Sequence, residues 1–158
     1  MTEASAVEVI PVDARGPVAR ACLDHYFDEL TARFPEGFDR GTDSATALED
    51  YRPPGGAFLV AQISGEVVGC GALRLFSPGV GEIKRMWVAP QARGRGVARK
   101  LLGALERAAA ERDLHTVRLD TNASLAEALR LYRTSGYHAI PRFNDNPYAH
   151  HWFEKTLD

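Results

Sequence analysis

The segment from Glu82 to Leu105 holds the residues whose types and spacing are best suited to chemistry. An alternating run ends at Pro90, glycines follow at positions 94 and 96, and helical periodicity begins at Val97. Glycines at such a strand–loop–helix junction let the backbone turn and leave amide N–H groups unpaired at the helix N-terminus. These donors and the helix dipole predict a site for a phosphorylated ligand. Four basic residues surround the loop: Arg93, Arg95, Arg99 and Lys100.

Two common phosphate-binding loops do not fit this segment. A nucleotide-triphosphatase loop requires Lys and then Ser or Thr after its last glycine, whereas Val97 and Ala98 follow Gly96. A dinucleotide-binding fingerprint requires a third small residue where this chain has Arg99. The sequence therefore disfavours a nucleotide triphosphatase and an NAD(P)-dependent oxidoreductase.

The complete pattern of this loop resembles that of a known family. Gln91-x-x-Gly94-x-Gly96-x-Ala98, directly after a strand that ends Trp-Val-x-Pro, is similar to the acyl-CoA pyrophosphate loop of the GNAT N-acetyltransferases. The stretch 129–137, Leu-Arg-Leu-Tyr-Arg-Thr-Ser-Gly-Tyr, resembles the Leu-Tyr-x-x-x-Gly-Phe/Tyr signature near the C-terminal end of GNAT domains. The matched segments lie within residues 57–140.

The resemblance implies acetyl-CoA as the acyl donor and no metal. It implies that the backbone of the strand segment 86–88 pairs with the pantetheine arm, and that the Val88 N–H polarises the thioester carbonyl. The side chain of Trp87 faces the other way, so we expect it in the core or at a dimer surface. The residues assigned to the donor are Met86, Trp87, Val88, Gln91, Arg93, Gly94, Arg95, Gly96, Val97, Ala98 and Asn122.

Glu82 and Tyr132 are the predicted catalytic residues. An acceptor amine must lose a proton before it attacks the thioester, and Glu82 is the predicted base, acting through water. The alternative is that Glu82 only forms a weak ion pair with Lys84. Tyr132 is expected beside the departing sulfur. Because a phenol with a pKa of ~10 is a poor proton donor to a thiolate of ~8.5, a hydrogen bond to the sulfur is favoured.

The acceptor is predicted to bind between two irregular segments, residues 35–56 and 141–151. The first hypothesis is a small primary amine, such as an amino acid, amino sugar or polyamine, attacked directly in one complex. A protein lysine or N-terminus, and a non-catalytic acyl-CoA-binding sensor, are the alternatives. The predicted acceptor residues are Phe34, Phe38, Asn144 and Tyr148.

The elements that position these residues indicate an α/β (α+β) fold with a mixed, mostly antiparallel sheet of about six to seven strands and about four helices. A strand–helix–strand step from Glu82 to Asp120 predicts a parallel, right-handed crossover. The expected strands are 7–12, 57–63, 67–76, 82–88, 116–120, 137–140 and 151–157. The expected helices are 17–33, one after Asp43, 97–112 and one that opens at Ser124.

Three local patterns refine these elements. Alternation places Glu82, Lys84, Met86 and Val88 on one face of their strand, and Ile83, Arg85 and Trp87 on the other. The helix 17–33 carries Ala21, His25 and residues 27–30 near one stripe. The last helix begins with a Ser124-x-x-Glu127 capping box and closes at Gly136.

Composition bounds the remaining possibilities. The 158 residues predict a single domain, 1–158, and the net charge of -2 argues against a nucleic-acid binder. The chain has no apolar run near the ~20 residues of a membrane helix and no signal peptide pattern, so we expect no membrane partner and a cytoplasmic location. The adjacent His150 and His151 point to opposite faces, which disfavours a metal site. An exposed strand edge at 150–157 is compatible with a homodimer.

Overall fold

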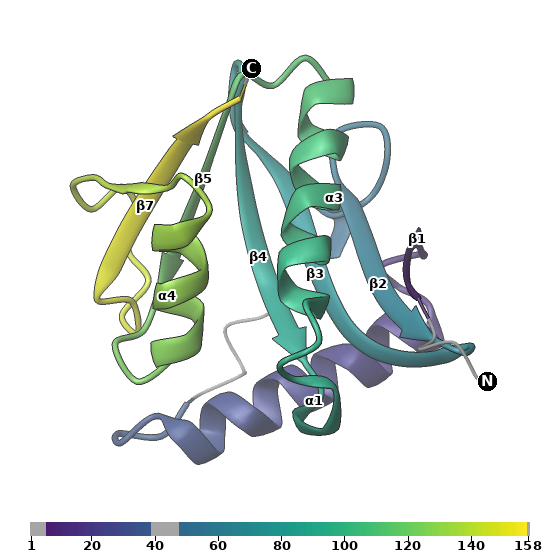
Figure 1. Cartoon of the computed structure of the whole chain (residues 1–158). Coiled ribbons are helices and arrows are strands. Elements are labelled where there is room, and N and C mark those ends of the chain that lie inside the picture. The colour runs from purple at the N-terminus through teal and green to yellow at the C-terminus, as the bar shows by residue number, and fades with distance from the viewer. Residues whose placement is uncertain (1–5, 39–47, 158) are drawn as a thin grey trace.

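The computed structural model describes residues 6–38 and 48–157, which form a seven-stranded sheet with helices on both faces (Figure 1). The strand order is β1-β2-β3-β4-β5-β7-β6, and every neighbouring pair is antiparallel except β4 and β5. The mixed, mostly antiparallel sheet is thus confirmed. The strands are β1 Val7–Pro11, β2 Ala57–Ile63, β3 Glu66–Ser77, β4 Val80–Val88, β5 Thr116–Thr121, β6 His138–Ala139 and β7 His151–Thr156.

The α-helices in the described ranges number three, together with a short 3-10 helix, η2. The fourth helix, expected after Asp43, falls largely on residues 39–47, which lie outside the described residues. No helix within the described ranges has the length and apolar character required to cross a membrane. The bounds are α1 Pro17–Arg33, η2 Pro90–Ala92, α3 Val97–Glu111 and α4 Ala126–Thr134.

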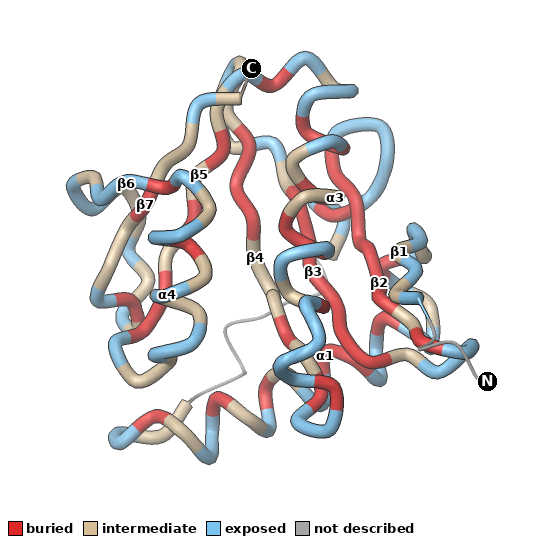
Figure 2. The backbone as a smooth tube through the Cα atoms, in the orientation of Figure 1, coloured by how far each residue is buried: buried red, intermediate tan, exposed pale blue. Residues whose placement is uncertain are grey.

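One part of the core lies between α3 and the central strands, and Figure 2 shows buried residues running along β2, β3 and β4 beneath this helix. Leu101 and Leu105 of α3 are fully buried over Gly69 and Gly71 of β3. A Cβ at Gly71 would lie 2.7 Å from Leu105 Cδ1, so the glycines allow α3 to approach the sheet closely.

Helix α1 covers the opposite face, although its buried stripe differs from the prediction. Ala21 and His25 are exposed, and the buried positions are Ala19, Cys22, Leu23, Phe27 and Leu30. This spacing of three and four residues is that of an amphipathic helix, rotated by one position from the expected stripe. The rotation turns Cys22, Phe27 and Leu30 into the core beneath the sheet and leaves Ala21 and His25 exposed.

Strand β4 contains a β-bulge that the alternating pattern does not predict. Arg85 has a φ of 61°, and Gly71 of β3 lies opposite two residues of β4, Arg85 and Met86. An extra residue moves all later side chains to the other face. The prediction that Glu82 shares a face with Met86 and Val88 is therefore wrong.

The pairing of β3 with β4 shows the true faces. Residues 70, 72 and 74 of β3 alternate onto one face, and their partners on β4 are Trp87, Lys84 and Glu82. This is the face that α1 covers, since Trp87 stacks on the imidazole of His25 in α1 with ring centroids 5.0 Å apart. Met86 lies on the other face, where its sulfur would meet a Cβ at Gly71 beside α3.

Strands β4 and β5 separate soon after they meet. The predicted parallel crossover is confirmed, but the two strands pair only between 80–82 and 116–118. Beyond Glu82 the strands diverge in a V, and β7 runs beside β5 rather than beside β4 (Figure 1). The second half of β4 thus presents an open backbone edge.

Two predictions about the C-terminal third are wrong. Helix α4 begins at Ala126 without a side-chain cap, and the Ser124 N–H donates to Asn122 Oδ1 (2.8 Å), so Ser124 and Glu127 do not form a capping box. Strand β7 is not a free edge, because β5 pairs along one side and β6 pairs with Phe153 and Glu154 on the other. The predicted closure at Gly136 holds, with φ at 93°.

The packing of α3 on the sheet yields a stability prediction. Leu105 is fully buried, whereas Leu75 on β3 is 50% exposed. Leu105→Ala is expected to lower the free energy of unfolding by about 2–5 kcal/mol through lost burial and a cavity. Leu75→Ala, the same chemical change at an exposed site, should alter it by about 0.5 kcal/mol or less. Equal losses in urea denaturation would contradict the assigned core.

Candidate active site

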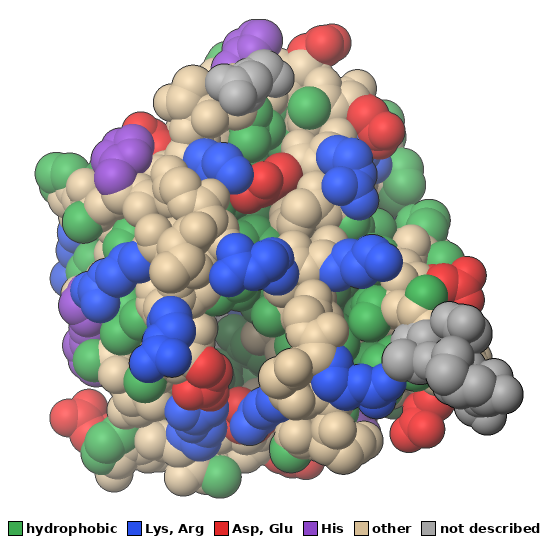
Figure 3. Space-filling model, viewed as in Figure 1, with side chains coloured by type: hydrophobic (Ala, Val, Ile, Leu, Met, Phe, Trp, Pro, Cys, Tyr) green, Lys and Arg blue, Asp and Glu red, His purple; other side chains and the backbone are tan. Residues whose placement is uncertain are grey.

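A cavity of about 1070 Å³ occupies the space where β4 and β5 have parted. Its walls come from α1, the glycine loop before α3, α4 and residues 144–149. Figure 3 shows a hollow between α3 and α4 with basic side chains around its rim. Arg93, Arg99 and Arg130 are among the lining residues on this side. The cavity therefore combines an electropositive mouth with the open edge of β4.

The glycine loop has the geometry of an anion cradle. Gly94 and Gly96 have φ values of 80° and 79°, and α3 begins immediately afterwards at Val97 without a side-chain cap. The first-turn N–H groups have no intrahelical acceptor, so they remain available to a ligand. A Cβ at either glycine would meet no atom of the described residues within 4 Å, so these residues leave the space above the loop open. Pyrophosphate oxygens fit these donors.

A chain of ion pairs joins this loop to α1 and α4. Arg93 Nε donates to the Val88 carbonyl (3.2 Å), and the Arg93 guanidinium also pairs with Glu29 of α1. Glu29 pairs with Arg33 (3.2 Å), which in turn forms an ion pair with Glu127 of α4. The hydrogen bond with Glu127 raises the pKa of Arg33 and lowers the pKa of Glu127. These contacts hold the three elements together along one side of the cavity.

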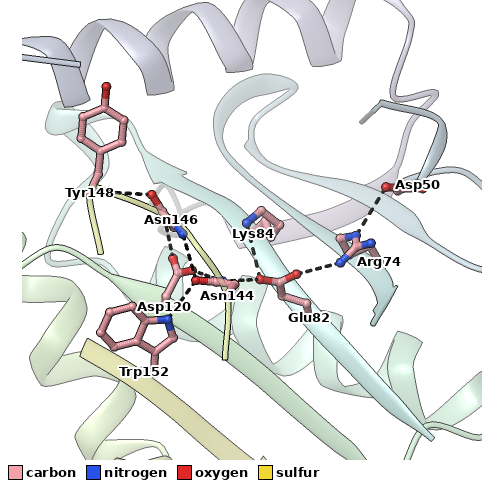
Figure 4. Close-up of polar contacts among 9 residues, drawn as sticks. All are labelled: Asp50, Arg74, Glu82, Lys84, Asp120, Asn144, Asn146, Tyr148 and Trp152. Carbon is pink, nitrogen blue, oxygen red and sulfur yellow. Dashed lines mark hydrogen bonds and ion pairs between the residues drawn. The ribbon is translucent and has the colours of Figure 1, made fainter. Parts of the chain in front are cut away.

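Glu82 lines the cavity where β4 and β5 part, and it has two cations beside it (Figure 4). Only 4% of its side chain is exposed, and its Oε1 accepts a hydrogen bond from Arg74 (2.9 Å). Its Oε2 lies 3.5 Å from Lys84 Nζ. Arg74 is shared with Asp50, at 3.4 Å. The contact between Glu82 and Lys84, which was the non-catalytic alternative for Glu82, is thus present as part of a larger ionic network.

Asn144 links Glu82 to a second carboxylate, Asp120 of β5 (Figure 4). Asn144 Nδ2 lies 2.5 Å from Asp120 Oδ2 and 3.3 Å from Glu82 Oε2. Trp152 Nε1 donates to Asn144 Oδ1 (3.0 Å), which fixes the amide so that its NH₂ group faces both carboxylates. Asn146 donates to the other oxygen of Asp120 at 3.2 Å.

Tyr132 reaches the same cavity from α4. Its side chain is 5% exposed, and its hydroxyl has no hydrogen-bond partner among the residues that the structure describes. Burial raises the pKa of this phenol, with smaller contributions from Tyr26 and Asp120. The hydroxyl therefore stays protonated and can donate to a ligand atom.

Aromatic side chains line the α1 side of the cavity. Phe38 packs against Tyr148 with ring centroids 4.7 Å apart, and Phe34 lies 5.8 Å from the same ring. Residues 39–47 of the predicted acceptor loop lie outside the described residues. The two segments assigned to the acceptor, before and after the central strands, thus meet at one aromatic wall.

Most residues singled out from the sequence line the cavity, and Gln91 and Arg95 do not. Asn122 lines it too, but its amide is engaged by the chain itself, with Nδ2 donating to the Tyr148 carbonyl (2.6 Å) and Oδ1 accepting from Ser124. Several polar residues of the site were not predicted from the sequence: Glu29, Arg33, Arg74, Asp120, Asn146 and Trp152. Alternation within β5 places Arg118 and Asp120 on one face, but the register that brings Asp120 to the face of Glu82 and Trp152 is given only by the structure.

Comparisons with known proteins agree with this geometry. Residues 23–137 match the model of the acetyltransferase (GNAT) family. The chain is 42% identical over 116 residues to an IAA acetyltransferase of Azospirillum brasilense, covering 73% of this chain and 71% of that protein. The chain therefore belongs to the GNAT family and is an N-acetyltransferase.

Solved structures share the fold. A protein of Klebsiella pneumoniae, described as an acyl-CoA N-acyltransferase, is 29% identical with a TM-score of 0.77, over 96% of this chain and 98% of that one. YncA of Salmonella typhimurium, solved with acetyl-CoA as its cofactor, has a TM-score of 0.72 at 19% identity, over 97% of this chain and 95% of that one. At 19% identity, the likeness to YncA concerns the fold alone.

The depressed pKa of Glu127 predicts a pH-dependent contribution to stability. The ion pair with Arg33 stabilises the fold above the unfolded-state pKa, about 4.3, and is lost as the pH falls through the lower folded-state value. Because 55% of the Glu127 side chain is exposed, we expect Glu127→Gln to cost at most about 1 kcal/mol at pH 7.

Urea unfolding at several values between pH 7 and pH 3 tests this effect. The difference between wild type and Glu127→Gln should shrink toward zero at the acidic end. Glu111→Gln serves as the control, because Glu111 is exposed on α3 and has no ion pair among the described residues. A difference for Glu127→Gln that stays constant with pH would refute the assignment.

Proposed function

We propose that this N-acetyltransferase transfers an acetyl group from acetyl-CoA to a primary amine of a small molecule. The amine attacks the thioester directly while both substrates are bound. The observation that carries the proposal is a continuous cavity that joins the glycine loop at one end to carboxylates at the other. Such a cavity holds donor and acceptor in reacting geometry without a covalent enzyme intermediate.

The donor would lie along the open edge of β4. Its pyrophosphate would rest on the N–H groups of the loop 94–98, and its pantetheine arm would pair with the backbone of 86–88. The Val88 N–H would polarise the thioester carbonyl as negative charge develops on the oxygen. Support comes from the short pairing of β4 with β5, which leaves the C-terminal half of β4 free on that side.

The acceptor would bind at the carboxylate end. Phe34, Phe38 and Tyr148 form an aromatic wall of the same cavity, which suits a small molecule better than a folded protein chain. The Tyr132 hydroxyl would donate a hydrogen bond to the departing sulfur. Because burial raises the pKa of this phenol, full proton transfer from it to a thiolate becomes still less favourable than in water.

Titration calorimetry tests the donor site. Gly94→Glu is expected to weaken acetyl-CoA binding by 100-fold or more, because it puts a bulky negative charge into the anion cradle. Gly65→Glu is the matched control, since Gly65 has the same φ of 80° and the same open surroundings but lies in the β2–β3 turn. Equal affinities for the two variants would reject the pyrophosphate assignment.

Thiol release with a panel of amines tests the reaction. Turnover with one class of small amine would establish the acceptor class, whereas tight acetyl-CoA binding without any turnover would favour the sensor alternative. Acetylation confined to protein lysines or N-termini would replace the small-molecule acceptor.

Tyr132→Phe tests the role of the phenol. The variant should lose about 10-fold or more in kcat, the value of a hydrogen bond of roughly 1.4 kcal/mol in the transition state, with unchanged acetyl-CoA affinity. The ring remains to pack against Phe153, so stability should be preserved. Unchanged kcat would remove Tyr132 from the mechanism.

A further inference from the structure

The two carboxylates at the acceptor end of the cavity have different partners. Glu82 is held by Arg74 at 2.9 Å and by Lys84 at 3.5 Å, one cation on each oxygen. Within the described ranges, Asp120 accepts side-chain hydrogen bonds from two neutral amides alone, those of Asn144 and Asn146. Among the described residues, no Lys, Arg or His forms an ion pair with Asp120.

This difference decides which carboxylate can take up a proton at small cost. A proton on Glu82 would remove the negative charge that compensates Lys84. It would also remove one of the two carboxylates, Glu82 and Asp50, that compensate Arg74. Uncompensated charges in a nearly buried network are costly. A proton on Asp120 would leave no cation without its partner, and the amides of Asn144 and Asn146 can rearrange toward the remaining lone pairs.

Asp120 is also placed where a nucleophile would approach. It lies near the end of β5, past the last residue that pairs with β4, and it lines the cavity together with Val88 and Tyr132. Its charge influences the Tyr132 phenol from across the cavity. Asn144 donates to the Asp120 carboxylate and is itself held by a hydrogen bond from Trp152 Nε1.

We propose that Asp120, rather than Glu82, receives the proton of the acceptor ammonium. Glu82 instead balances Arg74 and Lys84, and Asn144 is a positioning residue that holds Asp120. The assignment rests on the proposed acetyl transfer to an amine. It replaces the base inferred from the sequence, whose supposed shared face with Met86 and Val88 is removed by the bulge at Arg85.

The protons and bonds balance as follows. The ammonium gives one proton to the Asp120 carboxylate, and the neutral amine then forms the C–N bond as the C–S bond breaks. A second proton passes from the nitrogen to the departing sulfur, which leaves as a thiol. Asp120 finally releases its proton to water, so ammonium and thioester yield amide, thiol and one proton.

Asp120→Asn tests the assignment against Asp113→Asn as the matched control. Asp113 is exposed just after the C-terminal end of α3, lies outside the cavity lining and forms no ion pair among the described residues, so its substitution makes the same chemical change without touching the site. Asp120→Asn should lower kcat/KM by 100-fold or more, within the ~10²–10⁴ range for loss of a general base. Acetyl-CoA affinity by calorimetry and the melting temperature should stay near wild type. Asp120→Ser, which also lacks the carboxylate, provides a second measurement if the Asn variant folds poorly.

The pH profile separates a base from a structural residue. In Asp120→Asn, kcat/KM should rise about tenfold per pH unit up to the pKa of the amine, ~10 for an alkylamine, because only the free amine reacts. In the wild type the profile should be flatter over this range. The variant keeps the other titratable or charged groups that face Asp120. A difference in the slope of the pH profile between wild type and Asp120→Asn therefore reports the Asp120 carboxylate itself. These groups are Glu82, Lys84, Arg74, Arg118, Tyr26 and Tyr132.

Three results would overturn the assignment. Activity of Asp120→Asn equal to that of Asp113→Asn would refute it while leaving the acetyl transfer intact. A larger loss for a folded Glu82→Gln variant than for Asp120→Asn, with a tenfold rise per pH unit in the Glu82 variant, would return the base to Glu82. Absence of thiol release by the wild type with every amine would refute both this assignment and the proposed function.

Discussion

Strands β4 and β5 exchange hydrogen bonds over only three residue pairs, and the rest of β4 must satisfy its backbone in another way. If β5 paired with β4 along its whole length, the sheet would be continuous, but β5 diverges from β4 and pairs with β7 along its length. The wedge between the strands is the cavity, and the open β4 edge is one of its walls. Helix α3, which connects the two strands, starts at the wide end of the same wedge, past the end of β4. Its N-terminal N–H donors and the open edge of β4 therefore face one space. Donor and acceptor sites thus follow from one topological feature.

Most charged groups along this cavity occur as ion pairs. At the mouth, Arg93, Glu29, Arg33 and Glu127 alternate in sign and tie the glycine loop to α1 and α4. Where β4 and β5 part, the nearly buried Glu82 lies between two cations, as expected because an unpaired buried charge is destabilising. Asp120 differs, because among the described residues only neutral amides donate hydrogen bonds to its carboxylate. A carboxylate without a cationic partner can accept a proton at smaller cost, which suits it to acid–base chemistry.

The bulge at Arg85 couples the two halves of the site. Before it, Glu82 and Lys84 face the α1 side of the sheet, and after it Met86 and Val88 face α3. The extra residue also increases the local twist of β4, which favours its departure from β5. Sequence alternation cannot reveal the bulge, because Arg85 is a non-glycine residue with a positive φ and its one-residue slip depends on the Gly71 partner across the sheet.

The sequence by itself determined the elements that carry local signals. The strand–loop–helix unit was defined by Pro90, by glycines 94 and 96 and by the periodicity from Val97, because φ preferences and side-chain periods act over a few residues. Only the tertiary structure decided that Glu82 is ion-paired with two cations and that Asp120 lies on the same face of the sheet as Glu82. It also decided that Glu127 pairs with Arg33 of α1 instead of capping α4. These contacts join residues far apart in the chain, such as Asn144 with Glu82, and nothing in the local pattern around either residue fixes their distance in space.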